Sequence, residues 1–159
     1  MAAILEQMQE RLDLLQRTRS IAIVGMSKNS SRSSHFVATY LAGSTDFEVY
    51  YVNPRETEIM GKPVYASLAD LPVVPDMVDV FRRVDDLPAV TDEAIAVGAT
   101  SVWFQLGLEH RDAAATAVAA GLDVVQNRCL KIEHARFRGG LHTAGFNTGV
   151  IDSRRARLV

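Results

Sequence analysis

The feature that most constrains the fold of this chain is an alternation of short apolar segments with segments of helical pattern. Five apolar segments predict buried strands: "SIAIVG", "FEVYYVN", "MVDVF", "SVWFQLG" and "LDVVQN". Residues 33–43, 87–98 and 109–121 have helical patterns between them. Strands that are apolar throughout are typical of parallel sheets with both faces covered. We therefore predict a doubly wound, Rossmann-like α/β fold, with a five-stranded parallel sheet and helices on both faces.

The 159 residues are enough for one domain with a single well-filled core. Residues 1–18 predict a leading amphipathic helix that packs on the sheet, because apolar residues follow helical spacing over residues 3–17. Residues 19–137 form the predicted Rossmann-like core, in which residues 61–72 are a short irregular connection. Residues 138–159 are rich in glycine and arginine and predict a carboxyl-terminal tail.

Composition excludes several classes of protein. No apolar run approaches the roughly 18 residues of a membrane span, and the amino terminus lacks the pattern of a signal peptide. Cys129 is the single cysteine, so an intrachain disulfide framework and a cysteine zinc cluster are excluded. We expect a cytoplasmic protein without a metal site. The formal net charge of −2 argues against a nucleic-acid binder that uses its whole surface.

The carboxyl ends of the predicted strands carry most of the candidate chemistry. In an open α/β sheet, ligands bind at this edge, where the strand order reverses. Phosphate oxygens accept charge-assisted hydrogen bonds from Arg and Lys, so cations and serines here suit a polyanion. The alternative is that these residues are charged only because loops are solvated. The strand ends supply Gly25, Ser27, Lys28, Ser30, Arg32, Asn53, Pro54, Arg55, Arg82, Arg83, Gln105, Gly107, Asn127 and Arg128.

Two departures from the dinucleotide-binding pattern narrow the range of candidate ligands. After the first strand, Gly25 is followed by Ser27 and Ser30 at positions where the G-x-G-x-x-G pattern has glycines. The second strand ends in "NPR", in place of the Asp or Glu that commonly holds the ribose hydroxyls of NAD. An arginine there suits a ribose with an extra phosphate, as in NADP or coenzyme A. The alternative is an X-Pro turn with exposed flanks.

An ordered series of motifs carries a resemblance to a known family: "IAIVGMS", "VYYVNPRETEIMGKPVYASLADLP", "VDVFRRVDDLP", "SVWFQLGLEH" and "LDVVQNRCLKIEH". Over residues 18–135 the chain resembles the stand-alone coenzyme A-binding proteins, which are similar to the amino-terminal domain of the succinyl-CoA synthetase α subunit. The resemblance implies coenzyme A as the ligand, with its phosphates near Gly25 and Ser27. It also implies that the adenosine lies near Asn53, Pro54 and Arg55, and that the neighbouring crevice walls are Phe81, Arg82, Gln105 and Gly107.

No constellation of catalytic groups accompanies this predicted site. His35, His110, His134 and His142 each lack a paired carboxylate or nucleophile, which favours surface or packing roles. Cys129 follows the last predicted strand, where packing is the commoner role and thiol exchange with coenzyme A is the alternative. We expect this chain to lack the phosphohistidine domain of the synthetases. We therefore predict no catalytic residue.

The sequence thus predicts a protein that binds coenzyme A or an acyl-CoA, as a non-catalytic binding or sensing module with a small-molecule ligand and no membrane partner. The alternative is an NADP-linked oxidoreductase, against which the missing catalytic groups count. A nucleic-acid-binding regulator that uses the arginines of the tail is a third hypothesis, disfavoured because no helix-turn-helix pattern is present. Self-association or a protein partner stays open.

Overall fold

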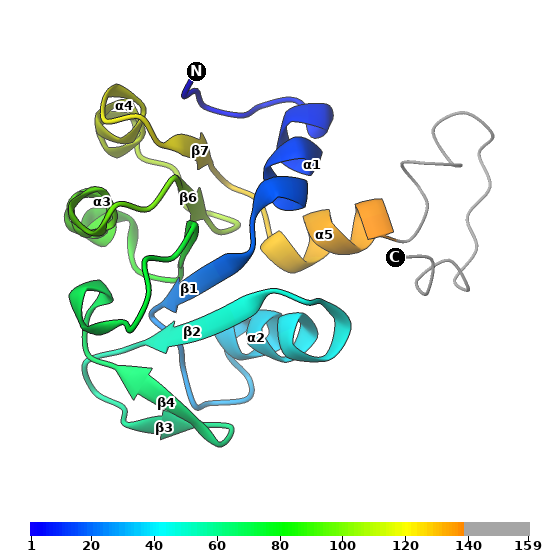
Figure 1. Ribbon diagram of the computed structural model, residues 1–159, viewed down its shortest axis with the longest axis vertical. Helices are drawn as coiled ribbons and strands as arrows, with labels where there is room; N and C mark the ends of the chain where they lie inside the picture. Colours follow the sequence, from blue (N-terminus) through cyan, green and yellow to red (C-terminus); the bar gives the residue numbers. More distant parts are fainter. Residues whose placement is uncertain (139–159) are drawn as a thin grey trace.

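The computed structural model describes residues 1–138, with side chains as far as Phe137 (Figure 1). Its helices are α1 (Met8–Arg17), α2 (Ser33–Ser44), α3 (Leu87–Val97), α4 (Arg111–Ala119) and α5 (Leu130–Arg138), with single 3-10 turns η1 (Leu68–Asp70) and η2 (Val84–Asp86). Its strands are β1 (Ser20–Val24), β2 (Glu48–Val52), β3 (Glu58–Ile59), β4 (Lys62–Tyr65), β5 (Met77–Val80), β6 (Ser101–Phe104) and β7 (Asp123–Val125). None of the helices in residues 1–138 is long and apolar enough to cross a membrane.

The sheet has the order β3-β4-β2-β1-β5-β6-β7, and all neighbours in it are parallel except β3 and β4. This confirms the doubly wound α/β class. The prediction of five strands is wrong, because the described residues form seven. The extra two make a hairpin whose turn residues, Met60 and Gly61, both have positive φ, at 51° and 76°. That is the geometry of a two-residue type I′ turn. The turn has Met60 in place of the usual Asn or Asp, so the sequence showed no hairpin signal.

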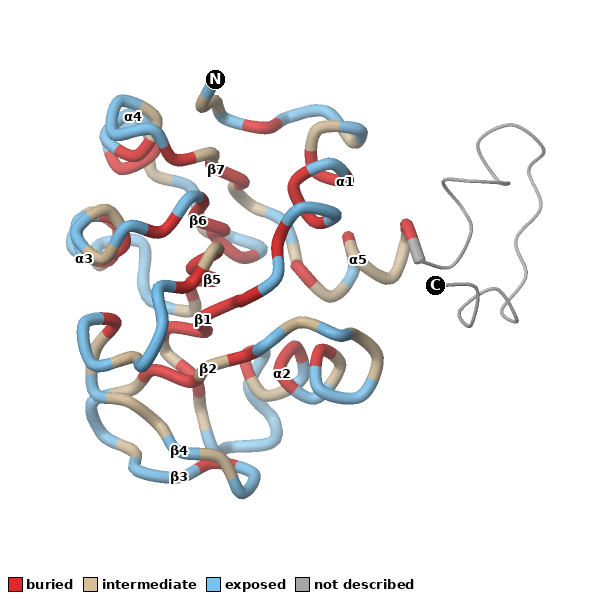
Figure 2. Tube along the Cα trace, viewed as in Figure 1, coloured by how far each residue is buried: buried red, intermediate tan, exposed pale blue. Residues whose placement is uncertain are grey.

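Both faces of the sheet are covered by helices, as Figures 1 and 2 show. Ile21 and Ile23 of β1 face the layer formed by α1, α2 and α5, together with Trp103. The intervening residues Ala22 and Val24 face the layer formed by α3 and α4. Successive side chains of a strand point to opposite faces, so a strand covered on both sides has to be apolar at every position. This is why "SIAIV" shows no polar alternation.

The leading segment differs from the prediction. Helix α1 begins at Met8, and residues 3–5 lie extended beside β7, where the amide of Leu5 donates to the carbonyl of Val124 at 2.7 Å. The helix starts where Glu10 accepts a hydrogen bond from the Gln7 amide, which closes a capping box. The chain therefore adds an edge contact to β7 before its first helix.

Helix α5 was not predicted from the sequence. Its inward positions include Leu130, Glu133 and Phe137, and the Glu133 carboxylate forms a buried ion pair with Arg11 of α1 at 2.5 Å. A buried charge interrupts the apolar periodicity by which a helix is detected. The predicted Gly/Arg-rich tail lies outside the described residues, apart from the backbone of Arg138, which ends α5.

Candidate functional site

The order of the strands creates one switch point that lies beside β1. From β1 the chain runs to β2 and the β3-β4 hairpin on one side, and it then returns to β5 on the other side of β1. The carboxyl ends of β1 and β5 therefore flank the crevice where α/β sheets bind ligands. Gly25 follows β1 and Phe81 follows β5, so these predicted residues lie on the two sides of the crevice.

Gly25 holds the two sides of the switch point in contact. Its φ is +87°, and a Cβ atom on it would approach the Phe81 carbonyl carbon to 3.0 Å and the carbonyl oxygen more closely still. Its amide donates to the Val52 carbonyl at 2.9 Å. A residue without a side chain is required here for both the conformation and the packing. The backbone of the loop after β1 consequently passes directly beside the residue that follows β5.

The serine-rich loop between β1 and α2 is ordered by its own side chains. The Ser27 amide donates to Ser34 Oγ at 3.0 Å, and the Asn29 amide donates to Ser27 Oγ at 3.1 Å. The Ser31 amide donates to Asn29 Oδ1 at 2.9 Å. The Ser27 amide is thus engaged with Ser34, while the Ser27 hydroxyl, which accepts from Asn29, keeps its proton for donation. Ser30 lies exposed at the outer edge of this loop.

Asn53 joins the loops after β1 and β2. Its side-chain amide donates to the Met26 carbonyl at 2.8 Å, and its Oδ1 accepts the Arg55 amide at 2.9 Å. The second bond is an Asx turn, which places Pro54 and Arg55 on the exposed side of the chain. Asn53 is therefore a structural link between the loops after β1 and β2, and Arg55 lies exposed beside it.

The exposed cations of this edge fall into two groups. Lys28 lies 3.8 Å from Glu56, and Arg82 lies 3.4 Å from Asp86. Within residues 1–138, no ion pair joins Arg32, Arg55 or Arg128 to a carboxylate, and all three are exposed. Guanidinium groups in this setting are available for the oxygens of a phosphate.

Gln105 is the one residue of the predicted set that is buried, with 5% of its surface exposed. Its side-chain nitrogen donates to Asp79 Oδ1, and its Oε1 accepts the Leu130 amide at 3.4 Å. Both ends of the side chain are thus engaged, and they tie β5 and β6 to the start of α5. The predicted role of Gln105 as a wall of the crevice is untested; the structure shows it as a support beneath the edge.

Asp79 is a buried acid that the sequence analysis did not identify. It is fully buried on β5, burial raises its pKa from 3.8 to about 8, and its Oδ2 has no hydrogen-bond partner among the described residues. The Gln105 hydrogen bond acts in the opposite direction on this pKa. A carboxylate inside the apolar strand "MVDVF" was the signal that could have revealed it.

The ends of β6 and β7 are joined by two residues of positive φ. Gly107 has φ +88°, Asn127 has φ +56°, and the Gly107 amide donates to Asn127 Oδ1 at 2.7 Å. Beside them Leu106 is 67% exposed. The edge therefore continues from the cationic loops after β1 and β2 to an exposed apolar side chain after β6.

Three of the candidate catalytic residues within the described part of the chain have structural contacts, and the fourth, His35, is half-buried in the first turn of α2. His110 accepts the Ala113 amide at 3.0 Å and so caps α4. His134 lies 2.8 Å from the Tyr40 hydroxyl and edge-on to the Phe47 ring. Cys129 is half-buried against the core, and His142 lies outside the described residues. No cluster of three metal-ligating side chains occurs in residues 1–138.

Comparisons with known proteins find a family model and relatives that cover most of the chain. A family model described as a CoA binding domain matches residues 19–135. The chain is 34% identical over 123 residues to the uncharacterized protein YneT of Bacillus subtilis (strain 168), which covers 77% of this chain and 90% of that protein. A hypothetical protein from Pyrococcus horikoshii OT3 superposes with a TM-score of 0.79 at 33% identity, over 86% of this chain and 96% of that one.

A larger protein shares the fold at lower identity. The apo form of dinucleotide-forming acetyl-coenzyme A synthetase 1 from Ca. Korarchaeum cryptofilum superposes with a TM-score of 0.65 at 23% identity. The match covers 73% of this chain and 28% of the synthetase. The fold described here is thus also found as one part of a much longer protein.

Proposed function

The chain belongs to the family of CoA-binding domains, and from this premise we propose that it binds coenzyme A or an acyl-CoA across the carboxyl edge of the sheet. In this proposal the protein is a binding or sensing module that catalyses no acyl transfer by itself. The phosphates lie over the loop after β1, and the adenosine lies near the end of β2. The pantetheine arm runs toward the end of β6.

The observation that carries this proposal is the chemistry around the switch point. The loops that follow β1 and β2 carry the Ser27 hydroxyl and the exposed guanidinium groups of Arg32 and Arg55. Phosphate groups bind strongly to such charge-assisted donors. The exposed Leu106 at the end of β6 offers an apolar contact to an uncharged arm. Coenzyme A combines three phosphates with such an arm in one molecule.

Thermal unfolding with added ligands tests the proposal. A ligand that binds only the folded state stabilises it by roughly 2.7 kcal/mol at a hundredfold excess over Kd. For a domain of this size, that raises Tm by about 5 to 11 °C. Coenzyme A should produce this shift, and NADPH at the same concentration should produce little. A large shift with NADPH and none with coenzyme A would contradict the proposal and favour an oxidoreductase.

The ribose phosphate provides a sharper test of the site. Dephospho-coenzyme A should give a smaller shift than coenzyme A, because Arg55 then loses one phosphate partner. Arg55→Ala should reduce the difference between the two ligands, whereas Arg19→Ala, at the opposite edge of the sheet, should leave it unchanged. Equal shifts for both ligands in the unmodified protein would remove the role of Arg55 but keep the site.

A direct assay addresses catalysis. The purified protein, mixed with a carboxylic acid, coenzyme A and ATP, should form no acyl-CoA if it is a binding module. Steady formation of acyl-CoA by the pure chain would show that the protein is an enzyme.

A further inference from the structure

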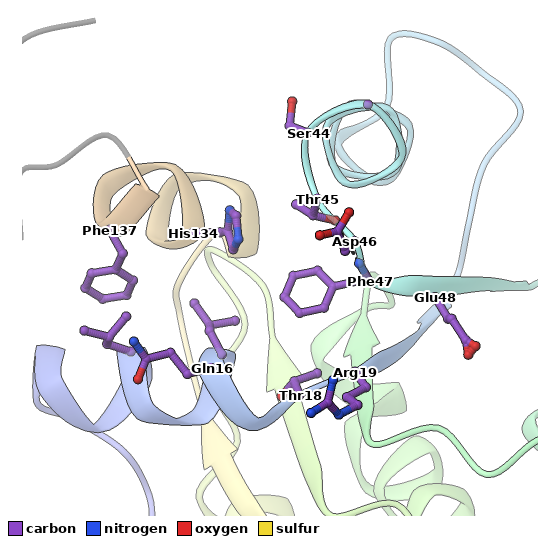
Figure 3. A pocket seen from close by; sticks show the side chains of 13 residues that line it. Gln16, Thr18, Arg19, Ser44, Thr45, Asp46, Phe47, Glu48, His134 and Phe137 are labelled. Carbon is purple, nitrogen blue, oxygen red and sulfur yellow. Dashed lines mark hydrogen bonds between the residues drawn. The ribbon is translucent and has the colours of Figure 1, made fainter. Parts of the chain in front are cut away.

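The amino edge of the sheet carries a groove that the coenzyme A proposal does not use. The groove has a volume of about 840 Å³ and lies between α1, α5 and residues 43–48, which join α2 to β2 (Figure 3). We call it the amino-edge groove. Its apolar walls include Leu12 and Leu15 of α1. Cavities of this size enclose ligands of several hundred daltons or short peptide segments.

Aromatic side chains border the amino-edge groove on two sides. Phe137, in the last turn of α5, lies over α1, and Phe47 lies on the segment before β2 (Figure 3). The ring of His134 stands between them, with its centroid 5.5 Å from that of Phe47. Two carboxylates, Asp46 and Glu48, lie exposed at the outer side of the groove, and Arg19 lies near them. The groove therefore combines an apolar floor with a mainly acidic rim.

The chain itself continues from the wall of this groove. Phe137 lines the groove one residue before α5 ends, and residues 139–159 follow directly. Twenty-one residues can extend over roughly 70 Å, far more than is needed to return to α1 and residues 43–48. Gly139 and Gly140 come first, and glycine permits the sharp change of direction that such a return requires.

The composition of residues 139–159 complements the groove. They contain three arginines and one aspartate, a formal charge of +2, so the −2 of the whole chain leaves −4 on residues 1–138. They also contain the large apolar residues Leu141, Phe146 and Ile151. The segment and all of α1 lie outside residues 19–135, which the family model matches. The groove is thus formed partly by residues of the family core, among them Asp46 and Glu48, and partly by α1 and Phe137, which lie outside that core.

We propose that residues 139–159 bind in the amino-edge groove of the same chain. Phe146 packs against Leu12, Leu15 and Phe137, and the arginines at 154, 155 and 157 lie toward the Asp46 and Glu48 carboxylates. An aromatic side chain is the natural anchor because it buries about 150 to 250 Å² of surface. The carboxyl edge stays free, so one edge of the sheet holds the ligand and the other holds the end of the chain.

Hydrogen exchange on the full-length protein tests this proposal. Amides within residues 139–159 should exchange at least tenfold more slowly than the same amides in a synthetic peptide of that sequence. Phe146→Asp should increase the exchange rates severalfold both in residues 139–159 and in residues 43–48. Asn147→Asp adds the same charge one position away and serves as the matched control, which should change neither. Unchanged exchange in β1 and β5 shows that each variant keeps its fold.

Three outcomes would overturn the proposal. The first is exchange of residues 139–159 at the peptide rate. In the second, Phe146→Asp increases exchange in residues 139–159 but leaves residues 43–48 unaltered, which would place the segment elsewhere. In the third, protection disappears on tenfold dilution while light scattering shows a dimer becoming a monomer, which would make a second copy the occupant of the groove.

Discussion

The two edges of the sheet are held together in different ways. At the carboxyl edge, loops are joined by bonds from short polar side chains to the backbone, as Asn53 and Asn127 show. At the amino edge, Asp76 accepts the amides of Arg19 and Ser20 at 2.8 and 3.2 Å, and a buried ion pair joins α1 to α5. The first arrangement uses neutral side chains and leaves Arg32 and Arg55 without a carboxylate partner among the described residues. The second uses carboxylates, because Asp76 holds the start of β1 and Glu133 holds α5 against α1.

Gly25→Ala should cause the largest loss of stability, at the carboxyl edge. The added methyl group would overlap the Phe81 carbonyl, and φ is +87°. A backbone shift of this kind costs more than about 4 kcal/mol, which denaturant unfolding would measure. Gly43→Ala, in α2, is the control, since nothing lies within 4 Å of its added Cβ. That change should stabilise the protein slightly. Equal effects of the two changes would contradict the packing role of Gly25.

Arg11→Ala should cause the next largest loss, at the amino edge. It removes the partner of the Glu133 carboxylate, whose side chain is 4% exposed, and an unpaired buried charge costs about 3 to 5 kcal/mol. Arg136, 3.4 Å from the other oxygen of Glu133, should reduce this cost. The double change Arg11→Met with Glu133→Leu should recover most of the stability. If the double variant were less stable than Arg11→Ala, the charge would not be the cause.

Asp79→Asn should change how stability depends on pH. The pKa of Asp79 is raised by burial from 3.8 to about 8 in the folded state, so only the unfolded state releases this proton between those values. The contribution of this raised pKa to the free energy of unfolding is complete below about pH 4. It is lost at about 1.4 kcal/mol per pH unit as pH rises to about 8.

The Asn variant lacks this titration, so its free energy of unfolding should rise relative to that of the unmodified protein as pH increases through this range. At pH 7 the variant should be more stable by about 2 kcal/mol, after subtracting the cost of burying an amide with an unpaired group. Urea unfolding at pH 5, 6, 7 and 8 measures the difference. Asp92→Asn, at an exposed position on α3, is the matched control. A difference that stays constant with pH would refute the buried titration.

Ser27→Gly should have the smallest effect and should act on binding. The Ser27 hydroxyl is a free donor at the crevice, and losing one bond to a charged phosphate costs about 1.5 kcal/mol, or roughly tenfold in the Kd for coenzyme A. The Tm without ligand should change little. Ser44→Gly, at the end of α2 on the opposite edge of the sheet, should leave the Kd unaltered. An unchanged Kd in Ser27→Gly would limit that serine to ordering the loop through Asn29.

Sequence motifs alone were sufficient to identify the family, and the match over residues 19–135 confirms that resemblance. They also placed the strand ends correctly, because the carboxyl ends of parallel strands converge whatever loops follow them. Three features escaped prediction: the hairpin turn through Met60, the helix containing Glu133, and the burial of Asp79. In each case a polar or atypical residue occupies a position where the pattern expects another type. The contacts of the predicted ligand residues with coenzyme A remain predictions.

Local sequence determined the central strands and helices of this protein. Continuous apolar runs can be satisfied only by a sheet covered on both faces, and glycine-terminated helical patterns separate them. The tertiary structure alone decided which polar groups are buried and which are exposed. Arg11 meets Glu133 across 122 positions of the chain, and Gln105 meets Asp79 across 26. The free-energy cost of burying these polar side chains is offset only because segments distant in the sequence supply their hydrogen-bond or ion-pair partners. No pattern along a short stretch of sequence could therefore reveal that they are buried.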